Sequence, residues 1–441
     1  MKHAACFQKI VSFLLLITAS AIAQNPLIRD QFTADPAARV FDGRVYVYPS
    51  HDINCGTQWF CMKDYHVFSS ENLSDWTDHG MIVTQEKVAW VDSTRNSMWA
   101  PDCIERNGKY YFYFPAIADT SKRLRGMAIG AAISDTPYGP FTPEPKPIEG
   151  VGGIDPNVFI DNDGQAYLYW AGRGLRGARL KENMLELDSD PVVFDNMPIG
   201  MKEGPFLFER KGVYYFTFPH VIDTTEALVY AIGTDPLGPF EYTGIIMDEY
   251  HPCWTNHHSI IEYNGQWILF YHRNDLSPDF DKNRSIRADS LFFNEDGTIR
   301  KVIPTLRGVG LTKAADKIQI DRYSSMSEAG TDIAFLDTAN TFGGWKTILS
   351  NKDAWIKYNS VDFGQNNWKF IKLRAKATNG SKLEIHIGNP GAFVSTKVSI
   401  PKNANWQIVS AKIKDVPEGI QNIGIILRAS GITEIDWMMF E

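Results

Sequence analysis

The protein has 441 residues, a length that predicts two to four domains, and 44% of its residues are apolar. Its 12 tryptophans, 18 tyrosines and 26 phenylalanines can fill sizeable cores, so the composition argues against disorder. The 44 basic residues against 52 acidic ones give a formal net charge of −8, which lacks the basic excess typical of nucleic-acid binding.

The N-terminus has the pattern of a secretion signal. Lys2 and Lys9 accompany an apolar run over residues 10–23 that ends in small residues. This pattern predicts a signal peptide over residues 1–23 and export to the periplasm or the medium. The run is too short to span a membrane, and no later stretch reaches about 18 apolar residues, so we expect no membrane partner.

Four cysteines follow the signal peptide: Cys55, Cys61, Cys103 and Cys253. Export permits disulfides, and Cys55 with Cys61 is the nearest pair, so we predict that bond. Four cysteines also allow three connectivities, and four free thiols stay open as an alternative.

One pattern recurs five times between residues 24 and 312. A glycine after a polar residue is followed by aromatic and β-branched residues, as hairpin turns entering a strand require. Intervals of 65, 56, 48 and 53 residues leave room for about four short strands each, which is typical of a β-propeller. We therefore predict a five-bladed propeller over residues 24–312. The five glycines are Gly43, Gly108, Gly164, Gly212 and Gly265.

Positions eight or nine residues before each repeat glycine should be equivalent and should face the axis of the propeller. Three of them are acidic and one is a histidine, so we expect them to converge at one mouth of the channel. A single Asp-Pro is more often a turn, but three like charges at one repeat position repel each other and need a compensating use. The positions are Asp35, Trp99 with Ala100, Asp155, Glu203, and Asn256 with His257.

Convergent carboxylates suit the hydrolysis of glycosidic bonds. One carboxylic acid protonates the leaving oxygen and a second carboxylate activates water or attacks the sugar, while a third can raise the pKa of the acid. Sugar rings also stack on aromatic side chains. The candidates for stacking are Phe32, Trp59, Trp90, Trp99 and Trp254.

The segments that begin at Ala34, Gly153 and Lys202 resemble the three acid motifs of glycoside hydrolase family 43. Members of that family are five-bladed propellers that cleave arabinose- and xylose-containing polysaccharides with inversion. The resemblance implies Asp35 as general base, Asp155 as orienter and pKa modulator, and Glu203 as general acid.

Two further site residues come from the same resemblance. His257 matches a histidine near a bound metal ion or water in the channel, with His258 leaving the register open by one residue. Arg284 matches an arginine that faces the sugar, and we count Phe32 and Trp99 with these two as substrate-binding residues.

Residues 313–441 are strand-rich, with frequent Gly and Asn turns, and predict a β-sandwich of the jelly-roll type. Both ends of this segment resemble carbohydrate-binding module family 6. That resemblance implies a structural calcium ion with Asp321, Asp436 and Gln319 as oxygen ligands, against the alternative of ordinary surface polar residues. For sugar binding, Trp406 is present, but Leu349 and Glu434 replace the expected Tyr and Asn.

We therefore expect an all-β, exported, exo-acting, inverting glycosidase that is a monomer and needs no cofactor for its chemistry. α-L-Arabinofuranosidase on plant polysaccharide side chains is the leading hypothesis, and β-xylosidase on xylo-oligosaccharides is the alternative. A propeller that binds glycan without cleaving it belongs to another class, and loss of one acid would favour it. A metal-centred hydrolase built on His257 and His258 lacks a recognised ligand spacing.

Overall fold

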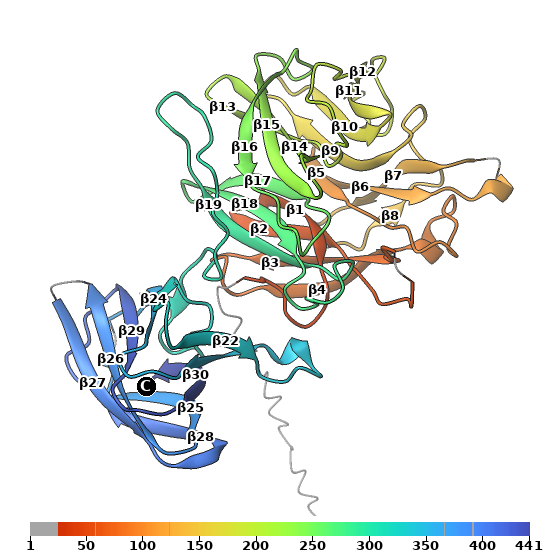
Figure 1. Cartoon of the computed structure of the whole chain (residues 1–441). Coiled ribbons are helices and arrows are strands. Elements are labelled where there is room, and N and C mark those ends of the chain that lie inside the picture. Colours follow the sequence, from red (N-terminus) through yellow and green to blue (C-terminus); the bar gives the residue numbers. More distant parts are fainter. Residues whose placement is uncertain (1–24, 58, 123, 366, 390–391) are drawn as a thin grey trace, which may run out of the picture.

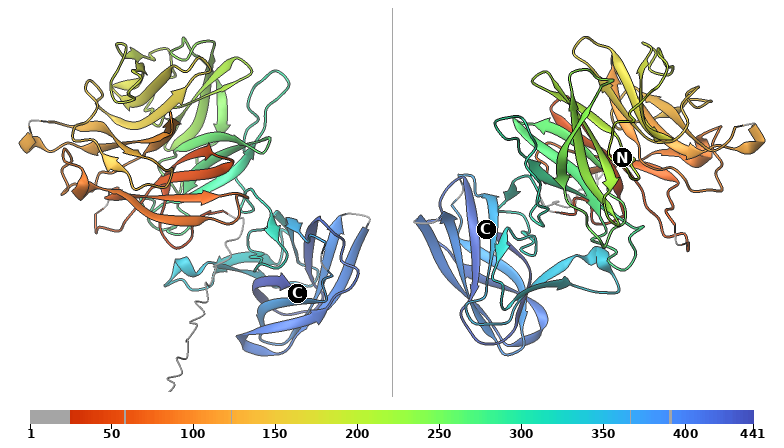
Figure 2. Two further views of the ribbon diagram at one scale, coloured as in Figure 1. Left: turned by 180° about the vertical axis from the view of Figure 1, so that it is seen from behind. Right: turned by 45° about the horizontal axis from the view of Figure 1, so that its top comes forward.

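The computed structural model describes residues 25–441 apart from residues 58, 123, 366 and 390–391. The predicted signal peptide lies outside the described residues. The described chain is almost entirely β-strand and forms two lobes, as Figure 1 and Figure 2 show. Among the described residues no helix is long and apolar enough to cross a membrane.

The first lobe is the predicted five-bladed propeller. Each blade is an antiparallel meander that runs outward from an innermost strand, which is the order that consecutive hairpins produce. Blade 1 contains β1 (Ala34–Phe41), β2 (Arg44–Ser50), β3 (Asp64–Ser70) and β4 (Thr77–Thr84). Blade 2 contains β5 (Asp102–Arg106), β6 (Lys109–Ile117), β7 (Met127–Ser134) and β8 (Thr142–Pro143). Blade 3 contains β9 (Ile154–Ile160), β10 (Ala166–Gly172), β11 (Gly174–Leu180) and β12 (Val192–Val193). Blade 4 contains β13 (Phe206–Arg210), β14 (Val213–Val221), β15 (Glu226–Gly233) and β16 (Glu241–Met247). Blade 5 contains β17 (His258–Tyr263), β18 (Gln266–Arg273) and β19 (Ser285–Leu291).

The repeat glycines lie at the turn between the first and second strands of every blade. At Asn107-Gly108 and Asn264-Gly265 both residues have positive φ, between 50° and 75°, as a two-residue type I′ hairpin turn requires. This geometry explains why a polar residue followed by glycine recurs at these sites.

The N-terminal segment closes the ring. The backbone N–H of Leu27 donates to Ile286 O at 2.8 Å, and that of Thr33 donates to Arg284 O at 2.9 Å, so residues 25–33 lie along β19. Five separate hydrophobic clusters fill the spaces between neighbouring blades, including one between blades 5 and 1 that contains Val47 and Phe270. The core of the propeller therefore lies between its blades, and the axis is left for polar side chains.

The second lobe is the predicted β-sandwich around one apolar core. Its first sheet has the order β20-β24-β29-β26-β27, with β21 on β24, and its second has the order β22-β23-β30-β25-β28. Alternating buried and exposed residues along β25 show the half-buried pattern of such sheets. The strands are β20 (Thr312–Lys313), β21 (Ser325–Met326), β22 (Thr331–Phe335), β23 (Trp345–Leu349), β24 (Trp355–Asp362), β25 (Phe370–Ala377), β26 (Ser381–Asn389), β27 (Ala392–Ile400), β28 (Asn403–Lys412), β29 (Ile420–Leu427) and β30 (Thr433–Phe440). Three single-turn 3₁₀ helices complete the described elements: η1 (Gln85–Lys87), η2 (Thr120–Lys122) and η3 (Thr341–Gly343).

The two lobes touch through specific contacts. Arg307 Nε donates to Asn359 O at 3.0 Å, and Arg322, from the start of the sandwich, donates to Asn25 O beside the ring closure. The last propeller strand ends at Leu291 and the first sandwich strand begins at Thr312, so the connection runs through residues 292–311.

Candidate active site

The innermost strands β1, β5, β9, β13 and β17 (Figure 1) each contact the next around the ring. Residues at their entry points surround one cavity of about 100 Å³. All five predicted repeat positions contribute to its wall, one from each blade. Around the axis the wall contains Asp35, Trp99, Ala100, Asp155, Glu203 and His257. The repeat therefore places these residues together although up to 222 positions separate them in the sequence.

Asp35 is the ionised carboxylate of the cavity. Its Oδ1 accepts a hydrogen bond from Arg284 at 2.8 Å, and its Oδ2 accepts one from Ser50 Oγ at 2.7 Å. Burial favours the neutral acid, but the Arg284 guanidinium and the hydrogen bond from Ser50 lower the pKa of Asp35 to about 2. Asp35 is therefore a carboxylate at any pH where the protein works, as a general base must be.

Arg284 is fixed by a second acid that the repeat pattern does not mark. Asp52 is buried and accepts hydrogen bonds from Arg284 Nε and NH2, both at 2.9 Å, and from the Arg284 backbone N–H at 2.8 Å. Bidentate pairing holds the planar guanidinium rigidly, so Asp52 directs Arg284 at Asp35. Arg284 lines the cavity as predicted.

Asp35 and Asp155 share an unusual backbone. Both have positive φ, 47° and 57°, which is rare outside glycine and clusters at functional sites. Asp155 Oδ2 accepts the backbone N–H of Gly204 at 2.9 Å, so it holds the peptide that follows Glu203. Burial and the neighbouring Glu203 raise the pKa of Asp155 well above its usual value.

Glu203 has the properties of a proton donor. Burial, followed by the negative charge of Asp35, raises its pKa to about 7, while Arg284 acts in the opposite direction. The charge that raises the pKa of Glu203 thus comes from Asp35 rather than from Asp155. Of the two roles predicted for Asp155, its hydrogen bond to Gly204 fits that of orienting the segment of Glu203.

Glu226 is a carboxyl that the sequence reasoning missed. It begins β15, is 2% exposed, and accepts the Asn256 backbone N–H on Oε2 at 2.7 Å. Oε1 is buried without a hydrogen-bond partner among the described residues. Burial and Glu203 raise the pKa of Glu226 well above its usual value, which favours its neutral form beside the proton donor. The sequence signal was weak, since Glu226 stands at a second position of its blade rather than at the repeat position.

The two adjacent histidines have different surroundings, which settles the register. His257 lines the cavity, and burial lowers the pKa of its imidazole. His258 is 1% exposed and its Nε2 lies 2.6 Å from Thr217 Oγ1, away from the cavity. His272, which the sequence reasoning did not mark, accepts the Asp35 backbone N–H on Nδ1 at 3.1 Å and is therefore neutral there. The predicted metal ion near His257 stays a prediction.

An aromatic wall closes one side of the cavity. Phe60 and Trp254 have ring centroids 6.2 Å apart and nearly parallel planes, and Trp59 lies against both. The disulfide Cys55–Cys61, which confirms the predicted pair, holds this part of the wall. Cys103 and Cys253 are free and buried.

Two of the aromatic candidates belong elsewhere. Trp90 is 1% exposed in the core between blades 1 and 2. Phe32 lies outside the cavity because its ring packs on Phe342 of the second lobe, with 4.9 Å between centroids. The prediction that Phe32 binds substrate is thereby corrected, since its partly exposed ring packs at the contact between lobes and does not line the cavity.

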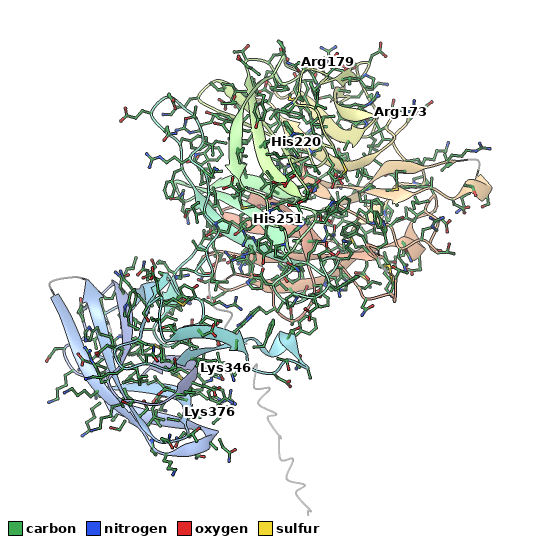
Figure 3. All side chains as sticks on the ribbon, in the orientation of Figure 1. Arg173, Arg179, His220, His251, Lys346 and Lys376 are labelled. Atoms are coloured by element: carbon green, nitrogen blue, oxygen red, sulfur yellow. A yellow bond between two sulfur atoms is a disulfide. The ribbon has the colours of Figure 1, made fainter. Side chains whose placement is uncertain are left out.

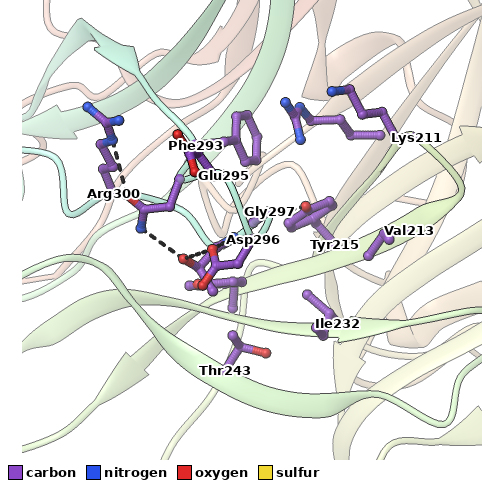
Figure 4. A pocket seen from close by; sticks show the side chains of 14 residues that line it. Lys211, Val213, Tyr215, Ile232, Thr243, Phe293, Glu295, Asp296, Gly297 and Arg300 are labelled. Atoms are coloured by element: carbon purple, nitrogen blue, oxygen red, sulfur yellow. Dashed lines mark hydrogen bonds between the residues drawn. The ribbon is translucent and has the colours of Figure 1, made fainter.

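A larger hollow of about 420 Å³ lies at the outer ends of blades 4 and 5 (Figure 4). Lys211, Glu295, Asp296 and Arg300 surround it, and Thr298 lowers the pKa of Asp296 through hydrogen bonds. The axial cavity has carboxyls with opposed pKa shifts, Asp35 at about 2 and Glu203 at about 7, so this smaller cavity is the candidate active site.

The predicted calcium ligands are paired with cations. Asp321 Oδ2 lies 2.9 Å from Arg322 Nε, and Asp436 forms an ion pair with Arg374. Asp321 Oδ1 remains buried and without a partner among the described residues. Each of these carboxylates thus has one cationic partner and Gln319 adds no charge, and the predicted calcium ion stays a prediction.

The predicted sugar-binding face of the second lobe has the expected substitutions. Leu349 is fully buried, so it cannot stack on a ligand. Glu434 pairs with both Lys346 and Lys376, which Figure 3 labels in this lobe. Lys376 also lies over the Trp406 ring, 5.1 Å from its centroid.

An ionised carboxylate and a protonatable carboxyl on the wall of one axial cavity are the two groups that hydrolysis of a glycosidic bond requires. Comparison with known families agrees, because the model of glycosyl hydrolases family 43 matches residues 23–299, and that of carbohydrate binding module family 6 matches residues 322–441. The chain belongs to glycosyl hydrolases family 43. The family resemblance and the fold drawn from the sequence are thus confirmed.

Similar proteins bear names of pentose-releasing enzymes. Xylosidase/arabinosidase 43A of Humicola insolens is 37% identical over 329 residues, covering 62% of this chain and 98% of the relative. A xylosidase/arabinosidase of Bacteroides ovatus is 35% identical over 322 residues, covering 62% of this chain and 95% of the relative. A solved family 43 β-xylosidase/α-arabinofuranosidase from a compost microbial metagenome, in complex with xylotriose and in a calcium-free form, is 35% identical with a TM-score of 0.59. That structure covers 64% of this chain and 98% of its own.

Proposed function

We propose that the protein is an exported, exo-acting, inverting hydrolase that removes single terminal α-L-arabinofuranosyl or β-xylosyl residues from plant polysaccharide fragments. The observation that carries the proposal is the axial cavity, whose wall holds the ionised carboxylate of Asp35 together with Glu203 and Asp155, two carboxyls with raised pKa. Its volume of about 100 Å³ is far below the roughly 300–1,000 Å³ of sites for drug-sized ligands, and favours a single sugar ring.

The geometry assigns a role to each group. Asp35 accepts a proton from a water molecule while the oxygen of that water attacks the anomeric carbon. Glu203 donates its proton to the departing glycosidic oxygen. The positive charge of Arg284 keeps Asp35 ionised. Asp155 accepts the Gly204 N–H and so holds the backbone next to Glu203, the proton donor. Attack by water in one step leaves the anomeric configuration inverted.

The same two carboxyl groups can hydrolyse an arabinofuranoside or a xylopyranoside. Arabinofuranosidase activity remains the leading assignment, and the relatives named for both activities support a single site that accepts a β-xyloside as well. Trp59, Trp99 and Trp254 offer ring faces to either sugar. The N-terminal signal pattern supports export, which places the enzyme where plant polysaccharide is found.

A glycan-binding propeller without catalysis is the competing reading, and the electrostatics argue against it. Binding alone gives no reason to raise the pKa of one carboxyl to about 7 beside another held at about 2.

The test uses purified protein with aryl α-L-arabinofuranoside, aryl β-D-xylopyranoside and xylotriose. We expect hydrolysis of both aryl glycosides, mutual competitive inhibition, and xylose with xylobiose as the first products of xylotriose. Asp35→Asn is the control and should abolish all three reactions. Release of internal fragments from long chains, or sugar binding without turnover, would overturn the proposal.

A further inference from the structure

Blade 1 carries a cluster of metal-ligating side chains outside the cavity. His51 follows the end of β2, Asp64 and His66 lie on β3, and Asp78 lies on β4. His51 Nδ1 is 2.6 Å from Asp64 Oδ1, and His66 Nε2 is 4.0 Å from the same oxygen. One ligand atom each from His51, Asp64 and His66 lies within 4.8 Å of the other two. The three side chains are only 10–22% exposed, which leaves access for an ion and few competing waters.

These spacings suit a small transition-metal ion. Zinc binds imidazole nitrogen and carboxylate oxygen at about 2.0–2.2 Å, so tetrahedral ligand atoms lie roughly 3.3–3.6 Å apart. The observed separations of 2.6 and 4.0 Å lie on either side of that value. Small side-chain rotations would therefore bring the three atoms onto one ion.

The outer hydrogen bonds are those of a metal-binding histidine. Such a histidine presents one ring nitrogen to the ion and donates the other N–H to a carboxylate. His66 Nε2 faces Asp64, while its Nδ1 lies 3.3 Å from Asp78 Oδ1. Asp78 is itself held, because Gln31 donates to Oδ2 at 3.1 Å and the Gly80 N–H donates to Oδ1 at 2.7 Å.

We propose that His51, Asp64 and His66 bind a divalent transition-metal ion of the zinc type, with Asp78 orienting His66. Two imidazoles and one carboxylate favour zinc, cobalt or nickel over calcium or magnesium, which prefer oxygen donors alone. Three protein ligands leave one position for water.

The site has a structural consequence for the cavity. His51 and Asp64 stand at the two ends of the segment that contains Cys55, Cys61 and the wall residue Phe60. Within that segment the Ile53 N–H donates to Cys61 O at 2.9 Å. A metal ion that joins the two ends therefore ties the aromatic wall to the sheet of blade 1.

The experiment titrates zinc chloride into tag-free, metal-stripped protein by calorimetry, and repeats the titration with cobalt to record its visible absorption. We expect one ion bound with micromolar or tighter affinity, at least 100-fold weaker binding in His51→Asn and in His66→Asn, and unchanged binding in His79→Asn. His79 is the matched control because it lies on β4 and pairs with Ser69 Oγ at 2.8 Å, outside the cluster.

Hydrogen exchange supplies a second readout. Zinc should slow amide exchange between His51 and Asp64 in the wild-type protein and leave it unchanged in His66→Asn, with circular dichroism verifying that each variant is folded. Failure of the wild-type protein to bind zinc below millimolar concentration would overturn the proposal, and so would equal affinity in both cluster variants and the control.

Discussion

The assignment of Glu203 as proton donor makes a quantitative prediction about pH. With a pKa of about 7, Glu203 is half protonated at neutral pH, so the active fraction should fall to roughly a tenth one unit higher and roughly a hundredth two units higher. The kcat/KM for xylobiose or an arabino-oligosaccharide should therefore decline with a slope of −1 above about pH 7. The Asp35 limb near 2 lies below the range in which activity is measured.

Glu203→Gln removes this alkaline limb. It should lower kcat/KM for oligosaccharides by about 10²–10⁴, because positioned acid catalysis contributes a factor of that size. An aryl glycoside with a good leaving group should lose far less, and its residual rate should be flat across the alkaline range.

Stability gives an independent readout of the same carboxyl. Its pKa is raised from 4.5 to about 7 in the folded protein, so the stabilising contribution of the protonated form is complete at low pH and is lost as the pH rises through 7. Glu203→Gln should therefore be more stable than wild type at pH 8, by at most about 3.5 kcal/mol at 1.4 kcal/mol per unit, and no more stable at pH 4. Chemical denaturation at both values measures this difference.

Glu226→Gln is the matched control for these measurements. Glu226 is buried beside Glu203, and its raised pKa favours the neutral form, which an amide mimics, so Glu226→Gln should leave the alkaline limb in place. If the alkaline decline in kcat/KM persists in Glu203→Gln, or disappears only in Glu226→Gln, Glu203 is not the proton donor.

Three further predictions concern other parts of the protein. Proton NMR of the first-formed sugar should show inverted anomeric configuration, and a retained product would exclude Asp35 as the base that activates water. Replacing Cys55 and Cys61 with serine should cost roughly 2 kcal/mol of stability by the loop-entropy relation and raise KM more than it lowers kcat, whereas an unchanged KM would dissociate the disulfide from the aromatic wall. In the inactive Asp35→Asn protein, the further substitution Trp406→Ala should not change the binding of xylan or arabinan oligosaccharides at micromolar concentration. Leu349 is buried and Lys376 covers the Trp406 ring, so this face offers no stacking site.

The fivefold repeat predicted the site as well as the fold, because a propeller converts equal sequence position into equal position around an axis. Asp35, Asp155 and Glu203 could be found in this way without any knowledge of contacts. The turn glycines reinforced the register, since positive φ at Asn107-Gly108 and Asn264-Gly265 is a local requirement that the residues themselves reveal.

The partners that tune these acids could not be found in the same way. Asp52 lies two residues after β2, and Glu226 begins β15. Acids also stand two residues after the second strand in blades 2, 4 and 5 and at the start of the third strand in blade 1, so position in the repeat did not single out these two. Their roles follow from depth, since Asp52 is 1% exposed and Arg284 must be neutralised where water is absent. Sequence carries the identity of such residues but not the burial that gives them a function.

In the second lobe, too, the sequence predicts the fold but not the surroundings of the buried charges. Its end motifs match those of a carbohydrate-binding module, and the fold follows the match, but ligand chemistry depends on which charges share a buried space. Arg322 is 1% exposed, pairs with Asp321, lies over the Trp345 ring at 4.0 Å and donates to Asn25 O at the ring closure of the propeller. A buried guanidinium in this position supplies the positive charge beside Asp321, while Arg374 pairs with Asp436, and it joins the start of the sandwich to Asn25 at the ring closure of the propeller. Charge neutralisation and attachment between lobes are thus combined in one arginine side chain.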